Sequence, residues 1–255
     1  MDFEIERVST MSHPRITAVI PARYASTRFP GKPLAMIAGK PLLQWVWEGA
    51  CQSSAIAKVL IATDDLRIAG LATKFGAEVK MTRSNHPSGT DRIAEAILGE
   101  KAEWILNIQG DEPLIEGSFL TRIIQGLNPS FGMATVATPL SSISDLNKPD
   151  VVKVAFDLTG KAVGFRRLAS AQEAGTWSHQ HIGIYAFQPA TLQKFVGLPP
   201  SPGEVRERLE QLRALENGIA IQVLPLTFVS VGVDTPEDVP RAERALAERA
   251  KSVSI

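Results

Sequence analysis

Residues 16–33, ITAVIPARYASTRFPGKP, join a short apolar run to a long polar loop, and this pairing decides the fold that we expect. The run at residues 16–20 is rich in β-branched side chains and lacks strict alternation, which is typical of a strand buried on both faces of a sheet. The loop behind it holds a serine, a threonine, a glycine and three cations, namely Arg23, Arg28 and Lys32. Such a loop can wrap a polyphosphate with its backbone N–H groups while its cations neutralise the phosphate charge.

Two common phosphate-binding motifs are absent from the sequence. The loop is not a Walker A motif, because Ser26 stands where its first glycine would be and Pro33 follows the lysine. No GxGxxG run occurs either, which disfavours a Rossmann-type dehydrogenase. A basic surface loop without a ligand remains an alternative, but ligands of parallel sheets bind at such strand ends, and this placement favours phosphate binding.

The rest of the chain alternates apolar runs with segments of helical periodicity. We expect strands at residues 16–20, 58–62, 78–81, 104–108, 133–137, 152–156, 182–187, 219–224 and 228–231. We expect helices at residues 41–52, 66–75, 91–98, 117–126, 189–195, 205–216 and 236–250. Strands separated by helices predict an α/β fold, with a Rossmann-like, mostly parallel sheet and helices on both faces.

The length of 255 residues fits one large domain better than several. We expect a flexible N-terminal extension over residues 1–15 and a single α/β domain over residues 16–255. Residues 157–180 interrupt the alternation with weak periodicity, and we interpret them as an insertion or a lid-like segment.

Composition excludes several classes of function. The chain has 27 Lys and Arg against 27 Asp and Glu, and zero net charge argues against a general nucleic-acid binder. One cysteine is too few for a disulfide framework or a cysteine zinc site. No apolar stretch approaches the ~20 residues of a membrane span. The charged N-terminus, MDFEIERVST, is unlike a secretory signal, so we expect a cytoplasmic protein with no membrane insertion.

Two carboxylates follow predicted strands beside a glycine. Asp111 lies in QGDEP, directly after the strand that ends at residue 108, and Asp234 lies in GVDTP, after residue 231. Two carboxylates from different strand ends can jointly hold Mg²⁺, which prefers oxygen ligands and also binds substrate phosphates. The alternatives are that Asp111 is a turn residue and that Asp234 only helps to cap the helix that begins at Pro236.

A set of motifs in fixed order gives the chain a family resemblance. From about residue 16 to residue 248 the chain contains PARYASTRFPGKPL, VLIATDD, MTRSNHPSGTDR, NIQGDEP, HIGIYAF, LEQLR and GVDTPEDV. This ordered set resembles the 3-deoxy-manno-octulosonate (KDO) cytidylyltransferases. The resemblance implies transfer of CMP from CTP to the anomeric hydroxyl of KDO, with release of pyrophosphate, for lipopolysaccharide synthesis. It also implies Mg²⁺ dependence, a nucleotide-diphospho-sugar transferase type of fold and a homodimer, with residues 157–213 serving the sugar acid and the dimer.

The resemblance also implies roles for individual residues. The catalytic set is Arg23, Lys32, Asp111 and Asp234, of which Asp111 and Asp234 hold the metal. The nucleotide-binding set is Pro21, Ala22, Arg23, Ser26, Lys32, Arg83, Ser88, Gly89 and Gln109. The set for the sugar acid is Arg167, His181, Tyr185, Glu210 and Gln211. Without the resemblance, His181 would be interpreted as a packed strand-end histidine, and Glu210 and Gln211 as part of a solvated helix face.

The sequence departs from the family pattern on the side of the sugar acid. Phe165-Arg166-Arg167 stands where the family has Phe-Ser-Arg, the stretch from Arg167 to His181 is shorter, and Gly203 replaces a leucine. The acceptor could therefore be 8-amino-KDO, another sugar acid or a phosphonate. An alternative of another class is a nucleotide-binding protein that has lost catalysis, which the presence of all four catalytic residues disfavours.

Overall fold

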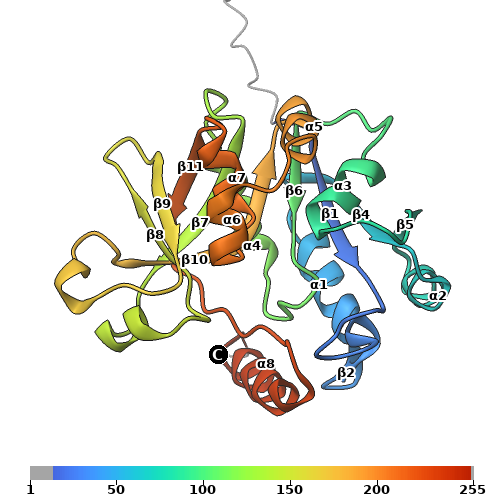
Figure 1. The fold of residues 1–255 in the computed structure, drawn as a ribbon. Coiled ribbons are helices and arrows are strands. Elements are labelled where there is room, and N and C mark those ends of the chain that lie inside the picture. The colour runs from blue at the N-terminus through green and yellow to red at the C-terminus, as the bar shows by residue number, and fades with distance from the viewer. Residues whose placement is uncertain (1–13, 254–255) are drawn as a thin grey trace, which may run out of the picture.

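The computed structural model describes residues 14–253 of the 255-residue chain, and the expected extension over residues 1–15 lies almost wholly outside them. A single sheet forms the centre of the molecule (Figure 1). Its strands run in the order β11 (Ile221–Pro225), β7 (Met133–Pro139), β10 (His179–Phe187), β6 (Trp104–Asn107), β1 (Ile16–Ala22), β4 (Ile56–Thr63) and β5 (Glu78–Met81). Only β10 is antiparallel to its neighbours along this order, which confirms the mostly parallel sheet.

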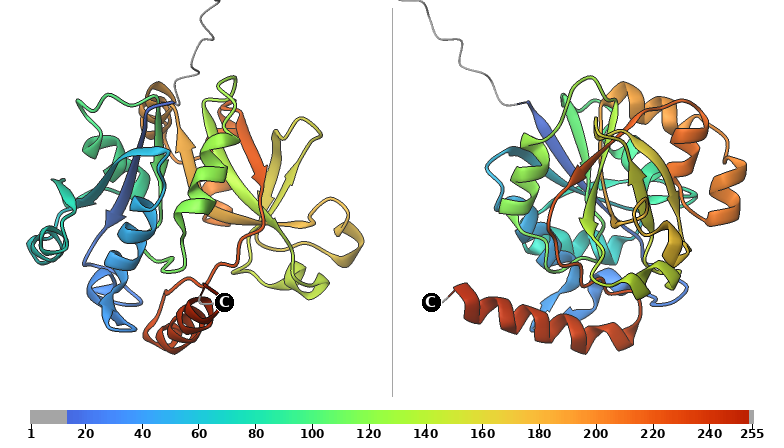
Figure 2. Two further views of the ribbon diagram at one scale, coloured as in Figure 1. Left: turned by 180° about the vertical axis from the view of Figure 1, so that it is seen from behind. Right: turned by 90° about the vertical axis from the view of Figure 1, so that its left-hand side faces the viewer.

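Helices cover both faces of the sheet, as the alternation of the sequence predicts. One layer contains α1 (Leu42–Cys51), α2 (Leu66–Lys74) and α4 (Gly117–Gln125). The other contains α3 (Gly89–Ala96), α5 (Pro189–Val196) and α7 (Gln211–Glu216), with the short α6 (Pro202–Glu207) beside α7. The second layer lies in front of the sheet in Figure 1, and α1 and α4 lie in front in the reverse view of Figure 2.

The strand β1 shows why its sequence lacks alternation. Ile16, Ala18 and Ile20 pack with the layer of α1, α2 and α4, whereas Val19 packs with the layer of α3 and α5. Both faces of the strand are therefore buried, so both sets of side chains must be apolar or small.

Three smaller groups of elements complete the fold. The 3₁₀ turn η1 (Lys32–Leu34) leads into a hairpin of β2 (Met36–Ile37) and β3 (Lys40–Pro41). The strands β8 (Lys153–Phe156) and β9 (Ala162–Arg166) form a second hairpin that extends the sheet beside β10. The turn η4 (Pro236–Asp238) leads into α8 (Val239–Val253), which packs against the first hairpin and α1 through Ala242 and Leu246.

Three of the expected elements differ in the structure. No strand forms at residues 228–231, because residues 226–234 cross the molecule as a strap without regular structure; Phe228, for example, donates its N–H to the Thr138 hydroxyl over 3.4 Å. The helix expected at residues 205–216 is broken into α6 and α7 at Arg208, whose φ of 54° is left-handed. Residues 157–180 contain β9 and the turn η3 (Ala171–Glu173), so much of this stretch is a hairpin arm of the sheet.

No helix in the described part of the chain is long and apolar enough to cross a membrane.

Candidate active site

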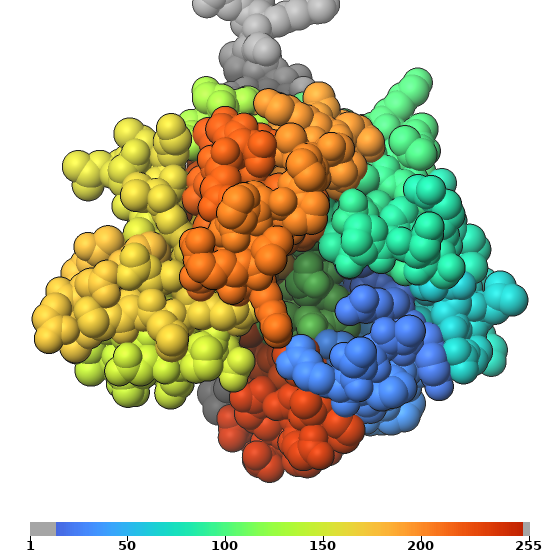
Figure 3. All heavy atoms as spheres, viewed as in Figure 1, coloured from blue at the N-terminus to red at the C-terminus, as the bar shows by residue number. Residues whose placement is uncertain are grey.

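A cavity of about 410 Å³ opens at the carboxyl ends of β1 and β6, where the placement rule predicts a ligand. The space-filling view shows a hollow between the loop that follows β1, drawn in blue, and the orange segment that carries α6 and α7 (Figure 3). Ten of the predicted site residues line the cavity: Pro21, Ala22, Arg23, Ser26, Lys32, Ser88, Gly89, Gln109, Asp111 and Asp234. The structure thus brings together residues from four separate motifs in one space.

The polar loop after β1 is folded back on Tyr24. The carbonyl of Tyr24 accepts hydrogen bonds from the N–H groups of Ser26, over 2.8 Å, and Gly31, over 2.9 Å. Gly31 has a φ of 73°, and a Cβ there would approach the Tyr24 ring at 3.0 Å, so glycine suits this turn. The Arg67 guanidinium lies 3.3 Å from the centroid of the Tyr24 ring, and its Nε and Nη2 donate to the two carboxylate oxygens of Asp65. This packing fixes the loop whose cations face the cavity.

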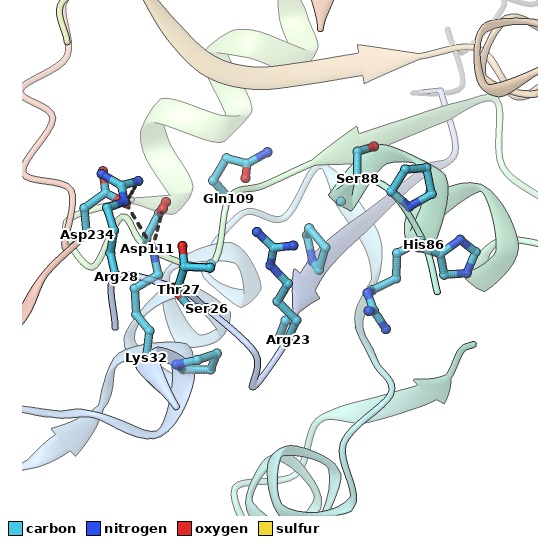
Figure 4. A pocket seen from close by; sticks show the side chains of 17 residues that line it. Arg23, Ser26, Thr27, Arg28, Lys32, His86, Ser88, Gln109, Asp111 and Asp234 are labelled. Carbon is cyan, nitrogen blue, oxygen red and sulfur yellow. Dashed lines mark hydrogen bonds and ion pairs between the residues drawn. The ribbon is translucent and has the colours of Figure 1, made fainter. Parts of the chain in front are cut away.

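The two predicted metal carboxylates meet at one cation. Lys32 Nζ lies 2.9 Å from Asp111 Oδ2 and 3.3 Å from Asp234 Oδ1, and Arg28 Nη2 lies 3.0 Å from the same Asp234 oxygen. Figure 4 shows these four side chains gathered at one end of the cavity. Two carboxylates that converge on a single positive charge are a donor set that fits Mg²⁺, which prefers oxygen ligands and keeps waters and substrate phosphate as its other ligands. Within the described residues, no cluster of three or more His, Cys, Asp or Glu side chains offers a metal site.

A third carboxyl, that of Glu112, lies behind this pair. Ser230 Oγ donates a short hydrogen bond to Glu112 Oε1, and Glu112 Oε2 is closed off from solvent with no hydrogen-bond partner among the described residues. Burial raises the pKa of Glu112 to about 7, and the nearby charge of Asp111 adds to the rise. The sequence analysis did not single out Glu112, although it lies inside the QGDEP motif.

The N-terminus of α3 forms the opposite wall of the cavity. Ser88 caps this helix by accepting a hydrogen bond from the N–H of Asp91 at 3.2 Å. A Cβ on Gly89 would lie 3.2 Å from the Pro21 ring, so the absence of a side chain lets the helix approach the end of β1 closely. Arg83 does not line the cavity; its Nε lies 2.8 Å from Glu95 Oε2, which also contacts the cavity residue His86.

Six further residues line the cavity and were not assigned a role from the sequence. They are Thr27, Pro33, His86, Pro87, Arg92 and Gly110. All of them lie inside or directly beside the motifs that carry the family resemblance. Arg28, the seventh, was recognised from the sequence as a loop cation but not as a partner of Asp234.

The residues predicted for the sugar acid form a mostly buried polar cluster beside the cavity. Glu210 accepts hydrogen bonds from Ser88 Oγ at 2.7 Å and Thr90 Oγ1 at 2.8 Å, and burial raises its pKa. The Tyr185 hydroxyl donates to Gln211 Oε1 over 3.0 Å. The interpretation of this helix face as solvated is therefore wrong for Gln211, which is buried.

His181 and Arg167 have structural partners in this conformation. The His181 ring is buried with its Nε2 2.9 Å from Thr135 Oγ1, and burial lowers its pKa to about 3. The Arg167 guanidinium donates to three backbone carbonyls, those of Pro149, Glu207 and Arg208. It thereby stabilises the left-handed break between α6 and α7. A role of either residue in binding a sugar acid stays a prediction.

The sheet and its cation-lined cavity define a nucleotide-binding transferase of the α/β class. The sequence pattern of a family described as cytidylyltransferase matches residues 17–221. A 3-deoxy-manno-octulosonate cytidylyltransferase of Syntrophotalea carbinolica is 46% identical over 245 residues, which cover 91% of this chain and 98% of the relative. One of Pseudomonas syringae pv. syringae is 48% identical over 248 residues, covering 90% and 97%.

A solved structure agrees with these relatives. It is described as CMP:2-keto-3-deoxy-manno-octonic acid synthetase complexed with CTP and matches with a TM-score of 0.87 and 37% identity, over 92% of this chain and 99% of that one. The chain belongs to the 3-deoxy-manno-octulosonate cytidylyltransferase family.

Proposed function

We propose that this protein transfers CMP from CTP to the anomeric hydroxyl of KDO, forming CMP-KDO and pyrophosphate. The observation that carries the proposal is the cavity at the ends of β1 and β6, which gathers ten residues that the family resemblance assigns to CTP, metal and catalysis. The CTP complex of a relative that matches over 92% of this chain supports the choice of nucleotide.

The residues of the cavity suit phosphoryl transfer. This chemistry needs an in-line approach and neutralisation of phosphate charge more than covalent help from the protein. Lys32 and Arg23 supply positive charge for the α-phosphate and for the leaving pyrophosphate. Lys32 bonds to Asp111 and Asp234 in this conformation, so it exchanges carboxylate partners for phosphate when CTP binds.

We propose that Asp111 and Asp234 hold Mg²⁺ when the nucleotide is present. Their oxygens already converge on one cation, and the metal would polarise the α-phosphate and lower the pKa of the attacking sugar hydroxyl. Arg28, which pairs with Asp234, keeps the local charge balanced. We expect Asp111→Asn to weaken the use of Mg²⁺, seen as a higher Mg²⁺ concentration for half-maximal turnover.

Two of the three departures from the family pattern, at Arg166 and Gly203, do not favour a different acceptor. Arg166, the last residue of β9, stands where the family has a serine. Its Nη1 lies 2.6 Å from Glu173 Oε1, and its guanidinium carbon lies 4.0 Å from the centroid of the Trp177 ring. Gly203 leaves room for Glu216, whose carboxylate accepts the Gly203 N–H over 3.1 Å; a Cβ there would collide with it. Both changes are absorbed by local packing. The relatives are named 3-deoxy-manno-octulosonate cytidylyltransferases, which supports KDO as the acceptor that we propose.

The wider setting of the reaction is part of the same proposal. We expect a homodimer in the cytoplasm whose product is used for lipopolysaccharide synthesis. Sedimentation equilibrium of the purified protein measures the oligomeric state directly.

The test is pyrophosphate release by the purified protein with Mg²⁺ and CTP, with and without KDO. We expect release only when KDO, CTP and Mg²⁺ are all present, and none when ATP replaces CTP. Binding of CTP without KDO-dependent release would point to another acid, and 8-amino-KDO, other sugar acids and phosphonates would then be compared. Absence of both binding and release would contradict the proposal.

A further inference from the structure

The strap at residues 226–234 carries Asp234 and forms no helix or strand of its own. Asp111 lies on a different segment, the loop between β6 and α4. The distance between the two carboxylates therefore depends on contacts that tie the strap to that loop.

Two hydrogen bonds make this connection. Ser230 Oγ donates a short bond to Glu112 Oε1, and the N–H of Val233 donates to the carbonyl of Asp111 over 2.9 Å. Lys32 adds an ionic link, because its Nζ lies close to both Asp111 and Asp234. We refer to the Glu112 carboxylate with Ser230 as the Glu112 clamp. Of the two hydrogen bonds, the clamp is the one that a side-chain substitution can remove.

The position of Glu112 is electrostatically unfavourable. One of its carboxylate oxygens is shielded from water without a partner in the described structure, and the group lies near the carboxylates of Asp111 and Asp234. Burying such a group costs free energy unless its hydrogen bonds compensate. The compensating hydrogen bond comes from Ser230, so the clamp holds the strap against the loop. A Cβ on Gly232 would lie only 3.4 Å from Glu112 Oε1, so the backbone passes close to the clamp.

We infer that Glu112 is a positioning residue, which acts through Ser230 to hold Asp234 opposite Asp111. The inference rests on the proposed function, in which these two carboxylates hold Mg²⁺ while CTP reacts. Glu112 itself does not line the cavity.

The test compares Glu112→Ala, Glu112→Gln and Ser230→Ala with a matched control, Glu116→Gln. Glu116 follows in the same loop, but its carboxylate pairs with Arg249, and no hydrogen bond or ion pair joins it to the strap in the described structure. Three quantities are measured: the Mg²⁺ concentration for half-maximal turnover, Mn²⁺ binding to the CTP complex by electron paramagnetic resonance, and hydrogen–deuterium exchange of the peptide that spans residues 226–238.

We expect Glu112→Ala to weaken Mn²⁺ binding and raise the Mg²⁺ requirement by roughly tenfold or more, because partners of metal ligands have effects of that size. Exchange in the strap should rise while the exchange of β1 and β6 stays as in the wild type. Ser230→Ala should shift the same quantities in the same direction by less. Glu112→Gln keeps an acceptor oxygen for Ser230 and should recover most of the loss, and Glu116→Gln should match the wild type.

Two results would overturn the inference. One is wild-type metal binding and strap exchange in Glu112→Ala. The other is an equal loss in Glu112→Gln and Glu112→Ala with unchanged exchange, which would mean that the charge of Glu112, not its hydrogen bonds, matters. If the wild type releases no pyrophosphate with KDO, the proposed function fails, but Mn²⁺ binding and strap exchange still decide the role of the clamp.

Discussion

Ser88 Oγ lies 2.7 Å from Glu210 Oε1, so a hydroxyl on the wall of the nucleotide cavity contacts a carboxylate on the segment that joins α6 to α7. Thr90 adds a second hydrogen bond to the same carboxylate at 2.8 Å. The two segments are far apart in the sequence, and the contact joins the predicted nucleotide side of the site to the predicted side of the sugar acid. The position of the Glu210 carboxylate thus depends on the position of α3. A substitution on one side of this contact should therefore alter the structure on the other side.

Thr90→Val tests this connection, because it keeps the shape of the buried side chain and removes one donor to Glu210. We expect the free energy of unfolding to fall by about 1–3 kcal/mol, the usual cost of a buried polar group left without its partner. Urea denaturation measures the change. Thr73→Val is the control: Thr73 is exposed and bonds only to its own helix in the described structure, so a similar loss there would contradict the argument.

Lys32→Ala should lower kcat by about 10²-fold or more, because a cation that stabilises the charge of the transition state is lost. The same change should strengthen Mn²⁺ binding in the absence of nucleotide. Lys32 competes with a metal for Asp111 and Asp234, and its removal leaves the two carboxylates with less neutralising charge. Steady-state kinetics and Mn²⁺ titration measure the two effects. Near-normal turnover would remove Lys32 from the mechanism.

Tyr24→Leu should raise the KM for CTP by roughly two- to fivefold, because the cation–π contact with Arg67 that helps to hold the loop is worth about 0.5–1 kcal/mol. Tyr24→Phe keeps the aromatic ring and should stay close to the wild type. Initial rates at varied CTP, with KDO saturating, give the KM values. Equal KM values for the Leu and Phe variants would show that the ring contact does not position the loop.

The burial of His181 predicts a loss of stability in acid. Its pKa is lowered to about 3 in the folded protein against 6.5 for a free histidine, so the unfolded chain binds the extra proton between these values. The contribution of His181 to the free energy of unfolding should therefore be fully present above about pH 6.5. It should decrease as the pH falls toward 3, by at most ~1.4 kcal/mol per pH unit. Urea unfolding at a series of pH values, for the wild type and His181→Asn, measures the slope. The variant should show the shallower decrease, and identical slopes would contradict the assignment.

The local sequence was sufficient for the elements of the nucleotide half. Apolar runs without alternation predicted β1, β4 and β6, because strands buried on both faces need apolar side chains on both. The rule that ligands bind at the carboxyl ends of parallel strands then placed Arg23, Lys32 and Asp111 in one site, and the structure brings them to one cavity. Asp234 was placed there because it follows the strand expected at residues 228–231; that strand does not form, although Asp234 does line the cavity.

Only the tertiary structure decided how distant segments meet. The sequence does not show that β10 runs antiparallel to both neighbours, that residues 228–231 form a strap instead of a strand, or that the chain turns at Arg208. Nor does it show that Glu112 accepts a hydrogen bond from Ser230, or that Glu210 accepts one from Ser88. The physical reason is that periodicity and turn residues act over a few positions and determine which element forms. Strand direction, the burial of a carboxyl and the partner of a hydrogen bond depend instead on residues from about 40 to about 120 positions away, which become neighbours only when the sheet is complete.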